Sequence, residues 1–130
     1  MNTRFLNVDL ELVATTDLQP LLAHLEASTI ELRNSVDDGN QTVWLELDVD
    51  PSDPDEAIRG FAALIESLPD HLREQWAGCD DRCLNIGIQS GVTPHASAFG
   101  ISRETLARIA GLAARLEITV YSPEPAATQT

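Results

Sequence analysis

The alternation of apolar and polar residues along residues 5–14 constrains the fold more than any other feature of the chain. Leucine or valine occupies each even position from 6 to 12, while Asn7, Asp9 and Glu11 occupy the odd positions between them. Successive side chains of a strand point to opposite faces of the sheet, so this segment predicts a strand with one buried and one polar face. Leu6 is expected on the buried face.

Further strands and helices follow with clear boundaries. Residues 29–36 and 42–49 also alternate, and the turn residues Asp37 to Asn40 between them predict a β-hairpin. Asp53, Pro54 and Glu56 have the spacing of a helix start. Asp53 suits the N-cap, Pro54 the first helical position, and Glu56 the third position, from which its carboxylate can reach back to the cap residue. We expect helices after Asp17, over 54–68, over 70–78 and after Ser102, and strands over 82–89 and 117–121. The helix after Ser102 is expected to bury Leu106, Ile109, Ala110 and Ala113.

This order of elements predicts an α+β fold, β-α-β-β-α-β-α-β. Its first six elements match a ferredoxin-like split βαβ core, with an added helix and strand. Such a core places its helices on one side of a mostly antiparallel sheet and leaves the other side open. We expect one domain over residues 1–122 and a frayed tail over 123–130.

The charge balance excludes several classes of partner. The 130 residues include 21 acids against 8 basic residues, all of them arginine, for a net charge of −13. Phosphate backbones and anionic lipids require Lys and Arg to neutralise them, so nucleic-acid and membrane binding are not expected. The first residues lack the organisation of a signal peptide, and we expect a cytoplasmic protein with Cys79 and Cys83 as thiols.

Period-two alternation concentrates much of this acidity on the open side of the sheet. The second strand is expected to show Glu31 and Arg33 there, and the last strand Glu117. A docking surface for a basic protein is one interpretation, with aromatic anchors inside an acidic rim. A solvated face that only prevents association is the alternative. The candidate partner-binding residues are Trp44, Asp9, Glu11, Glu46, Asp48 and Tyr121.

Other motifs fail on spacing, and no catalytic residue, metal or cofactor is predicted. Asp48, Asp50 and Ser52 begin like a calcium loop, but the twelfth position is Arg59 where a bidentate Glu is required. The two cysteines are separated by three residues, which is neither a zinc nor a thioredoxin-like spacing. Ser90 and His95 lie in the 90–100 loop without a nucleophile elbow or an oxyanion-hole signature.

Residues 55–122 contain a familiar pattern of core and capping positions. It includes Leu64 to Pro69, Leu84 to Ile88, Ile101 to Leu106 and Glu117 to Tyr121. This pattern resembles a family of small bacterial proteins catalogued as a domain of unknown function, and the resemblance carries over no functional residue. In size and acidity alone, the chain is similar to bacterial immunity proteins, which present acidic surfaces to basic toxins.

These observations lead to one expected function and two alternatives. The chain is expected to be a non-enzymatic binding protein that engages a basic partner, as an immunity protein or another inhibitor does. A small-ligand binder or hydrolase using the 90–100 loop is the first alternative, with anions held at the helix that begins after Ser102. A structural, self-associating domain is the second. The oligomeric state is not predicted.

Overall fold

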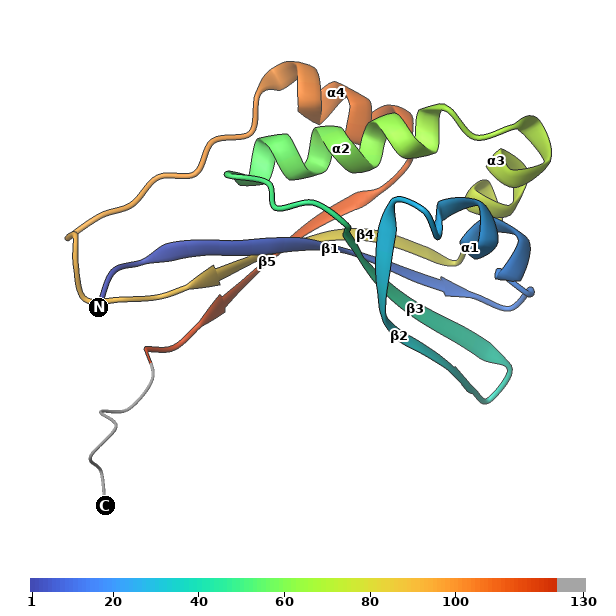
Figure 1. Ribbon diagram of the computed structural model, residues 1–130, viewed down its shortest axis with the longest axis horizontal. Helices are drawn as coiled ribbons and strands as arrows, with labels where there is room; N and C mark the ends of the chain where they lie inside the picture. The colour runs from blue at the N-terminus through green and yellow to red at the C-terminus, as the bar shows by residue number, and fades with distance from the viewer. Residues whose placement is uncertain (124–130) are drawn as a thin grey trace.

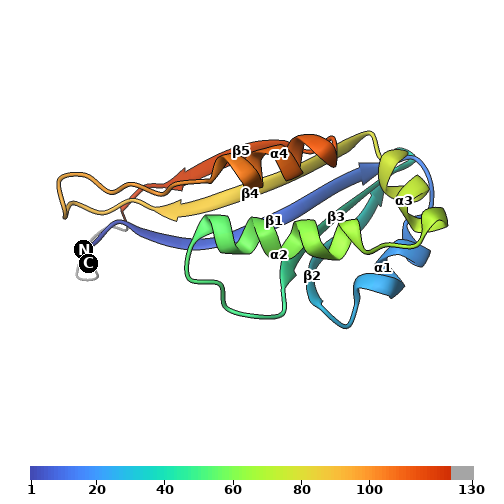
Figure 2. The same cartoon turned by 90° about the horizontal axis from the view of Figure 1, so that it is seen from above.

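The computed structural model describes residues 1–123 and contains a five-stranded sheet with four helices on one of its faces (Figures 1 and 2). The predicted tail lies almost entirely outside the described residues. The elements are β1 (Arg4–Ala14), α1 (Gln19–Leu25), β2 (Thr29–Asp37), β3 (Asn40–Leu47), α2 (Pro54–Glu66), α3 (Asp70–Ala77), β4 (Asp81–Gln89), α4 (Arg103–Gly111) and β5 (Arg115–Tyr121). The prediction of an α+β protein with a mostly antiparallel sheet is confirmed. Both helices expected between β3 and β4 are present, separated at Pro69 as predicted, although the predicted order of elements counted them as one.

The strands lie in the order β2-β3-β1-β4-β5. Every neighbouring pair is antiparallel except β4 and β5, which are parallel. The central position of β1 explains its pattern, because the even positions from Val8 to Ala14 are buried under the helices and the odd positions face away from them.

The core lies between the sheet and the helical layer. Phe61, Ile58 and Ile65 of α2 are fully buried, as are Leu10 and Leu12 of β1 beneath them. Burial of side chains of this size stabilises the fold by about 1.5–3 kcal/mol each. The α2 start has the predicted geometry, since the Asp53 carboxylate accepts the backbone N–H of Glu56 at 2.8 Å.

Two bulges change which face some side chains occupy. The ladder of β1 with β4 shifts between Phe5 and Asn7, so Phe5 packs against the core where Leu6 was expected. The ladder of β2 with β3 shifts between Glu31 and Arg33, which leaves Glu31 opposite the buried Leu45. Residues opposite each other share a face, so Glu31 lies on the helix side and its predicted place on the open face is wrong.

Helix α4 buries fewer residues than expected. Thr105, Ile109 and Leu112 are buried, whereas Leu106 is 46% exposed and Ala110 and Ala113 are also exposed. The physical reason is the position of α4 at the margin of the helical layer: α2 lies on one side of it, and no described element lies on the other (Figure 2). A narrow apolar stripe is therefore enough to hold it.

Candidate functional site

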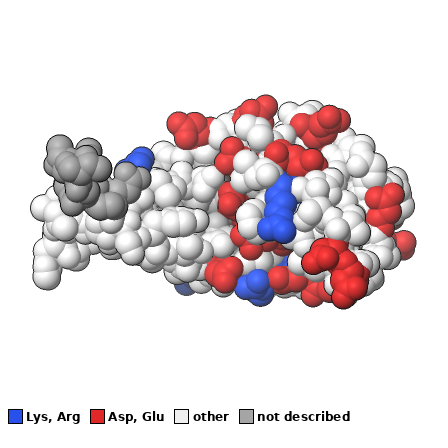
Figure 3. All heavy atoms as spheres, turned by 90° about the horizontal axis from the view of Figure 1, so that it is seen from below, with Lys and Arg blue, Asp and Glu red and all other residues white. Residues whose placement is uncertain are grey.

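The strand registers align side chains in rows across the open face, which is the face of the sheet opposite the helices. One row runs through Arg33, Trp44, Glu11, Cys83 and Arg115 from β2 to β5. The next row runs through Ile30, Glu46, Asp9, Asn85 and Glu117. Acids gather over this part of the face around arginine side chains, while the surface toward the N-terminus is mostly uncharged (Figure 3).

Asp9, Glu11 and Glu46 form an acidic cluster on the two central strands of these rows. All three are half-buried, and Asp9 lies between its two neighbours. Burial and, to a smaller extent, the charges of Glu46 and Glu11 together raise the pKa of Asp9 from 3.8 to about 6. The Oδ1 atom of Asp9 is buried and accepts no hydrogen bond. A buried acceptor without a donor is costly, so this atom is the least satisfied group of the open face.

Neutral amides hold the other two carboxylates of the cluster. Asn7 donates from Nδ2 to Glu46 Oε2 at 2.7 Å, and Asn85 donates from Nδ2 to Glu11 Oε2 at 3.1 Å. These amides orient the carboxylates without neutralising them. Among residues 1–123, no ion pair joins an arginine to any member of the acidic cluster. The cluster therefore keeps an excess of negative charge.

The arginines of the two rows are already engaged. The guanidinium carbon of Arg33 lies 4.9 Å from the centroid of the Trp44 ring, a cation–π contact. Arg115 holds Asp81 with two hydrogen bonds of 2.8 and 2.9 Å, and this lowers the pKa of Asp81. Arg115 also lies 3.9 Å from Glu117. Both arginines thus flank the acidic cluster without reaching Asp9.

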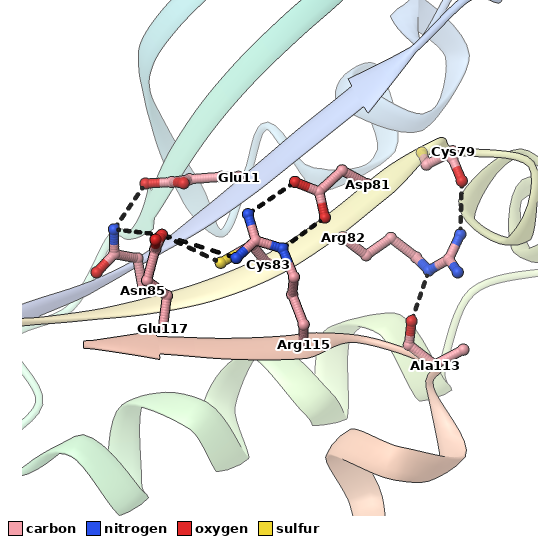
Figure 4. A network of polar contacts seen from close by, with 9 residues as sticks. All are labelled: Glu11, Cys79, Asp81, Arg82, Cys83, Asn85, Ala113, Arg115 and Glu117. Atoms are coloured by element: carbon pink, nitrogen blue, oxygen red, sulfur yellow. Dashed lines mark hydrogen bonds and ion pairs between the residues drawn. The ribbon is translucent and has the colours of Figure 1, made fainter. Parts of the chain in front are cut away.

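A second group of polar residues extends from Glu11 of the cluster across β4 to β5 (Figure 4). The oxygen and sulfur atoms of Glu11, Cys83 and Glu117 lie within 4.8 Å of one another, which is close enough for a metal ion. Cys83 Sγ is 3.8 Å from Glu117 Oε2, and burial raises the pKa of this thiol to about 12. A metal ligand must be a thiolate, and the amide of Asn85 already bridges both carboxylates. This geometry describes a satisfied hydrogen-bonding group better than a metal site.

Four predicted partner-binding residues are brought together and two are not. Asp9, Glu11, Glu46 and Trp44 are neighbours in the two rows. Asp48 follows the end of β3 and lines an open hollow of about 400 Å³ with Glu46 and Asp50. The partner of Tyr121 is Gln89, whereas that of Glu117 is Asn85, so Tyr121 lies about 13 Å along the strand from the Asp9 row.

Sequence reasoning placed Asn7 and Asn85 on the open face but missed two other residues near the cluster. Cys83 and Arg115 both lie on the open face. The position of Cys83 could have been predicted, because it is two residues before Asn85 in the same strand and therefore lies on the same face. The pairing of Arg115 with Asp81 had no such signal, because it depends on the parallel addition of β5 to β4.

The 90–100 loop extends away from the body as an arm (Figure 1), and residues 92–100 are all exposed. Ser90 donates its backbone N–H to Tyr121, while the four hollows described on the surface are lined by neither Ser90 nor His95. The backbone N–H of Ser102, at the start of α4, already binds the Asp55 carboxylate at 2.9 Å. This bond lowers the pKa of Asp55. The chain's own carboxylate thus occupies the position that the alternative function reserves for an anionic ligand.

Comparison of the chain with protein-family models, with curated proteins and with solved structures gives no significant match in any of the three. None of the described helices combines the length and apolar character needed to cross a bilayer. Cys79 and Cys83 are free and buried, and burial raises the pKa of Cys79 to about 11.

Proposed function

We propose that this chain is an acidic binding protein that engages a basic protein partner through its open face. The observation that carries the proposal is the unpaired carboxylate of Asp9, held between Glu11 and Glu46 without a cation. A lysine or arginine from a partner would relieve the repulsion among the three carboxylates of the cluster. Charge-assisted contacts of this kind contribute about 1.5–3 kcal/mol when they are shielded from water.

The hollow beside the cluster suits a long basic side chain. It lies beyond the end of β3, where the first residues of β1 have no paired residue of β3 beside them. Its lining includes the acids Glu46, Asp48 and Asp50 and the apolar Ile30 and Val49. Lys and Arg bury an apolar stem while their charged head remains near polar groups. The carboxylates at the rim would hold the head, and the apolar lining would hold the stem.

Trp44 supports the proposal through its contact with Arg33. The half-buried indole already carries one guanidinium at 4.9 Å, so its surroundings suit the apolar and cationic parts of a basic partner. Tryptophan is enriched among residues that dominate binding energy at interfaces. In this proposal Trp44 supplies contact area next to Glu11, and the acids set the orientation of the partner.

We further propose an inhibitory role, such as that of an immunity protein, because a compact acidic chain is suited to covering a basic protein. Two finer features belong to the same proposal. The first four strands, in the order β2-β3-β1-β4, support a ferredoxin-like split βαβ core with α4 and β5 added. The two free buried thiols support a cytoplasmic location.

A titration with an arginine octapeptide tests the surface assignment. The double variant Asp9→Asn with Glu46→Gln removes two charges from the cluster and preserves the shapes of both side chains. We expect its affinity for the peptide, measured by calorimetry, to fall about tenfold or more, since each tenfold loss corresponds to about 1.4 kcal/mol. Affinity of the wild-type chain should also weaken as salt rises from about 0.05 to 0.3 M.

The matched control is Glu26→Gln with Glu74→Gln, which removes two exposed acids from the helical layer. It has the same net charge as the cluster variant, and we expect less than a threefold change in affinity. Equal losses in the two double variants would show that the peptide responds to total charge, and the open face would then lose its assignment.

A further inference from the structure

Strand β5 forms one edge of the sheet and lacks the usual protection of an edge strand. It pairs with β4 over seven residues without a bulge, and it contains no proline. The opposite edge, β2, carries a bulge and the acids Glu31 and Asp37. Bulges and charges discourage further strand pairing, whereas a long regular edge invites it. Strand β5 also carries charged residues, Arg115 and Glu117, but it has no bulge, so of the two sheet edges within residues 1–123 it is the better suited to receive another strand.

The direction of the free backbone groups follows from one hydrogen bond. The Tyr121 carbonyl accepts the N–H of Ser90, which directly follows β4, at 2.8 Å. The N–H and C=O of a strand residue point to the same side, and alternate residues point to opposite sides. Tyr121 and every second residue before it thus face β4. The groups of Leu116, Ile118 and Val120 point outward from the sheet.

The same three residues form an exposed apolar row on the helix side of the sheet. Leu116 is 36% exposed, Ile118 62% and Val120 60%. Leu106 of α4 is also exposed, and its position on the helix, away from the Arg108 side that bonds to Glu66 of α2, directs it toward the β5 edge. Within residues 1–123, nothing covers this apolar surface.

We propose that a second copy of this chain pairs with β5 in antiparallel orientation, with a two-fold axis at Ile118. In this register Ile118 faces its own counterpart, and Leu116 faces Val120 of the other copy. All outward N–H and C=O groups of both strands are then hydrogen-bonded. The apolar row continues across the two-fold axis, and the two copies of Leu106 approach each other above it. An isologous dimer of this kind closes on itself.

Charge complementarity selects this register and this occupant. Glu117 faces Thr119 of the other copy and Arg115 faces Tyr121, so no like charges are directly opposed. A register centred on Glu117 would oppose two carboxylates, and one centred on Thr119 would place Leu116 beyond the opposing strand. A basic partner gains little at this edge, because Glu117 is already held by Asn85. The apolar row instead matches itself.

The oligomeric state of the full chain tests the proposal by size-exclusion chromatography with light scattering. At about 100 μM protein and about 0.3 M salt, we expect the wild-type chain to be dimeric and to dissociate on dilution. The dimer fraction should increase with salt, because each copy carries a net charge of −13. Binding of a basic partner to the open face has the opposite dependence, so the two proposals can fail separately.

Substitutions at the centre of the two-fold axis identify the contact. Ile118→Lys and Ile118→Glu each oppose like charges across the axis, and each variant alone should be monomeric. An equimolar mixture of the two should recover a heterodimer, because lysine then faces glutamate. Val36→Lys is the matched control, since Val36 is 72% exposed on the opposite edge strand, and this variant should remain dimeric.

Three results would overturn the proposal. They are a wild-type chain that stays monomeric at 100 μM, a dimer that persists in both Ile118 variants, and a mixture of these variants that remains monomeric. Two further results would also contradict the two-fold pairing at Ile118, because each would indicate that β2 takes part in the contact: growth beyond the dimer, and loss of the dimer only in Val36→Lys.

Discussion

Replacing Arg82 by methionine is expected to lower the free energy of unfolding by about 2–3 kcal/mol. The guanidinium of Arg82 donates from Nη1 to the carbonyls of Trp76, Ala77 and Cys79 at 3.2, 3.1 and 2.8 Å. Its Nε donates to Ala113 at 2.9 Å. One side chain therefore satisfies the end of α3 and joins it to the turn after α4. A hydrogen bond to a charged group contributes about 1.5–3 kcal/mol, and partial exposure keeps the total below a simple sum.

The measurement is urea denaturation followed by tryptophan fluorescence, because Trp76 is buried and bonds to the Leu112 carbonyl at 2.9 Å. Arg73→Met is the matched control. Arg73 lies in α3, the helix whose end Arg82 caps, and makes one long bond of 3.4 Å to the Ile65 carbonyl. We expect the control to cost less than about 1 kcal/mol. Equal effects in the two variants would show that general loss of charge, rather than capping by Arg82, determines the result.

The fold was predictable wherever one face of an element is buried and the other is exposed. Alternation identified β1 and β4 because Leu10 and Ile86 face the helices while Asp9 and Asn85 do not. It failed at the bulges, where an inserted residue such as Leu32 reverses the pattern without any change in residue type. For α4, the helical spacing of apolar residues predicted too many buried positions. An apolar residue such as Leu106 does not by itself indicate that the helix lies at the margin of the helical layer.

The face on which the acidic cluster lies was predictable, but the contacts between its strands were not. Asp9 and Glu11 share a strand face, so period two alone places them together. Their proximity to Glu46 requires that β3 pair directly with β1, which depends on the sheet order. Tyr121 was grouped with them because it shares their face. A face extends over many residues, however, and only the register gives the position along it.

Asp9→Asn is expected to stabilise the chain at pH 7 by about 1–2 kcal/mol. Burial and the charges of Glu46 and Glu11 raise the pKa of Asp9 to about 6, so ionising it in the folded chain costs free energy that ionising it in the unfolded chain does not. The full shift would correspond to about 3 kcal/mol, and the partial exposure of the carboxyl reduces this amount. Asparagine retains the shape and introduces a donor next to Glu46 and Glu11.

The sign of the pH dependence separates this cause from simple packing. Well below pH 3.8, Asp9 is protonated in both states, and the variant gains nothing from the lost charge. As pH rises from 4 to 6, the unfolded chain releases the proton first and the wild-type chain loses stability relative to the variant. The difference in free energy of unfolding should therefore grow over this interval and remain constant above it. A difference that is constant from pH 4 to 8 would contradict the assignment to ionisation.

The same carboxylate that destabilises the free chain would bind the partner. If Asp9 must be ionised to hold a cation, affinity for the arginine octapeptide should weaken as pH falls through 6, and Asp9→Asn should remove that dependence. Stability and affinity then change in opposite directions at one residue, as expected where a site retains an unfavourable charge for a ligand. A variant that gains stability and keeps its affinity would separate the two, and the Asp9 charge would then have no part in binding.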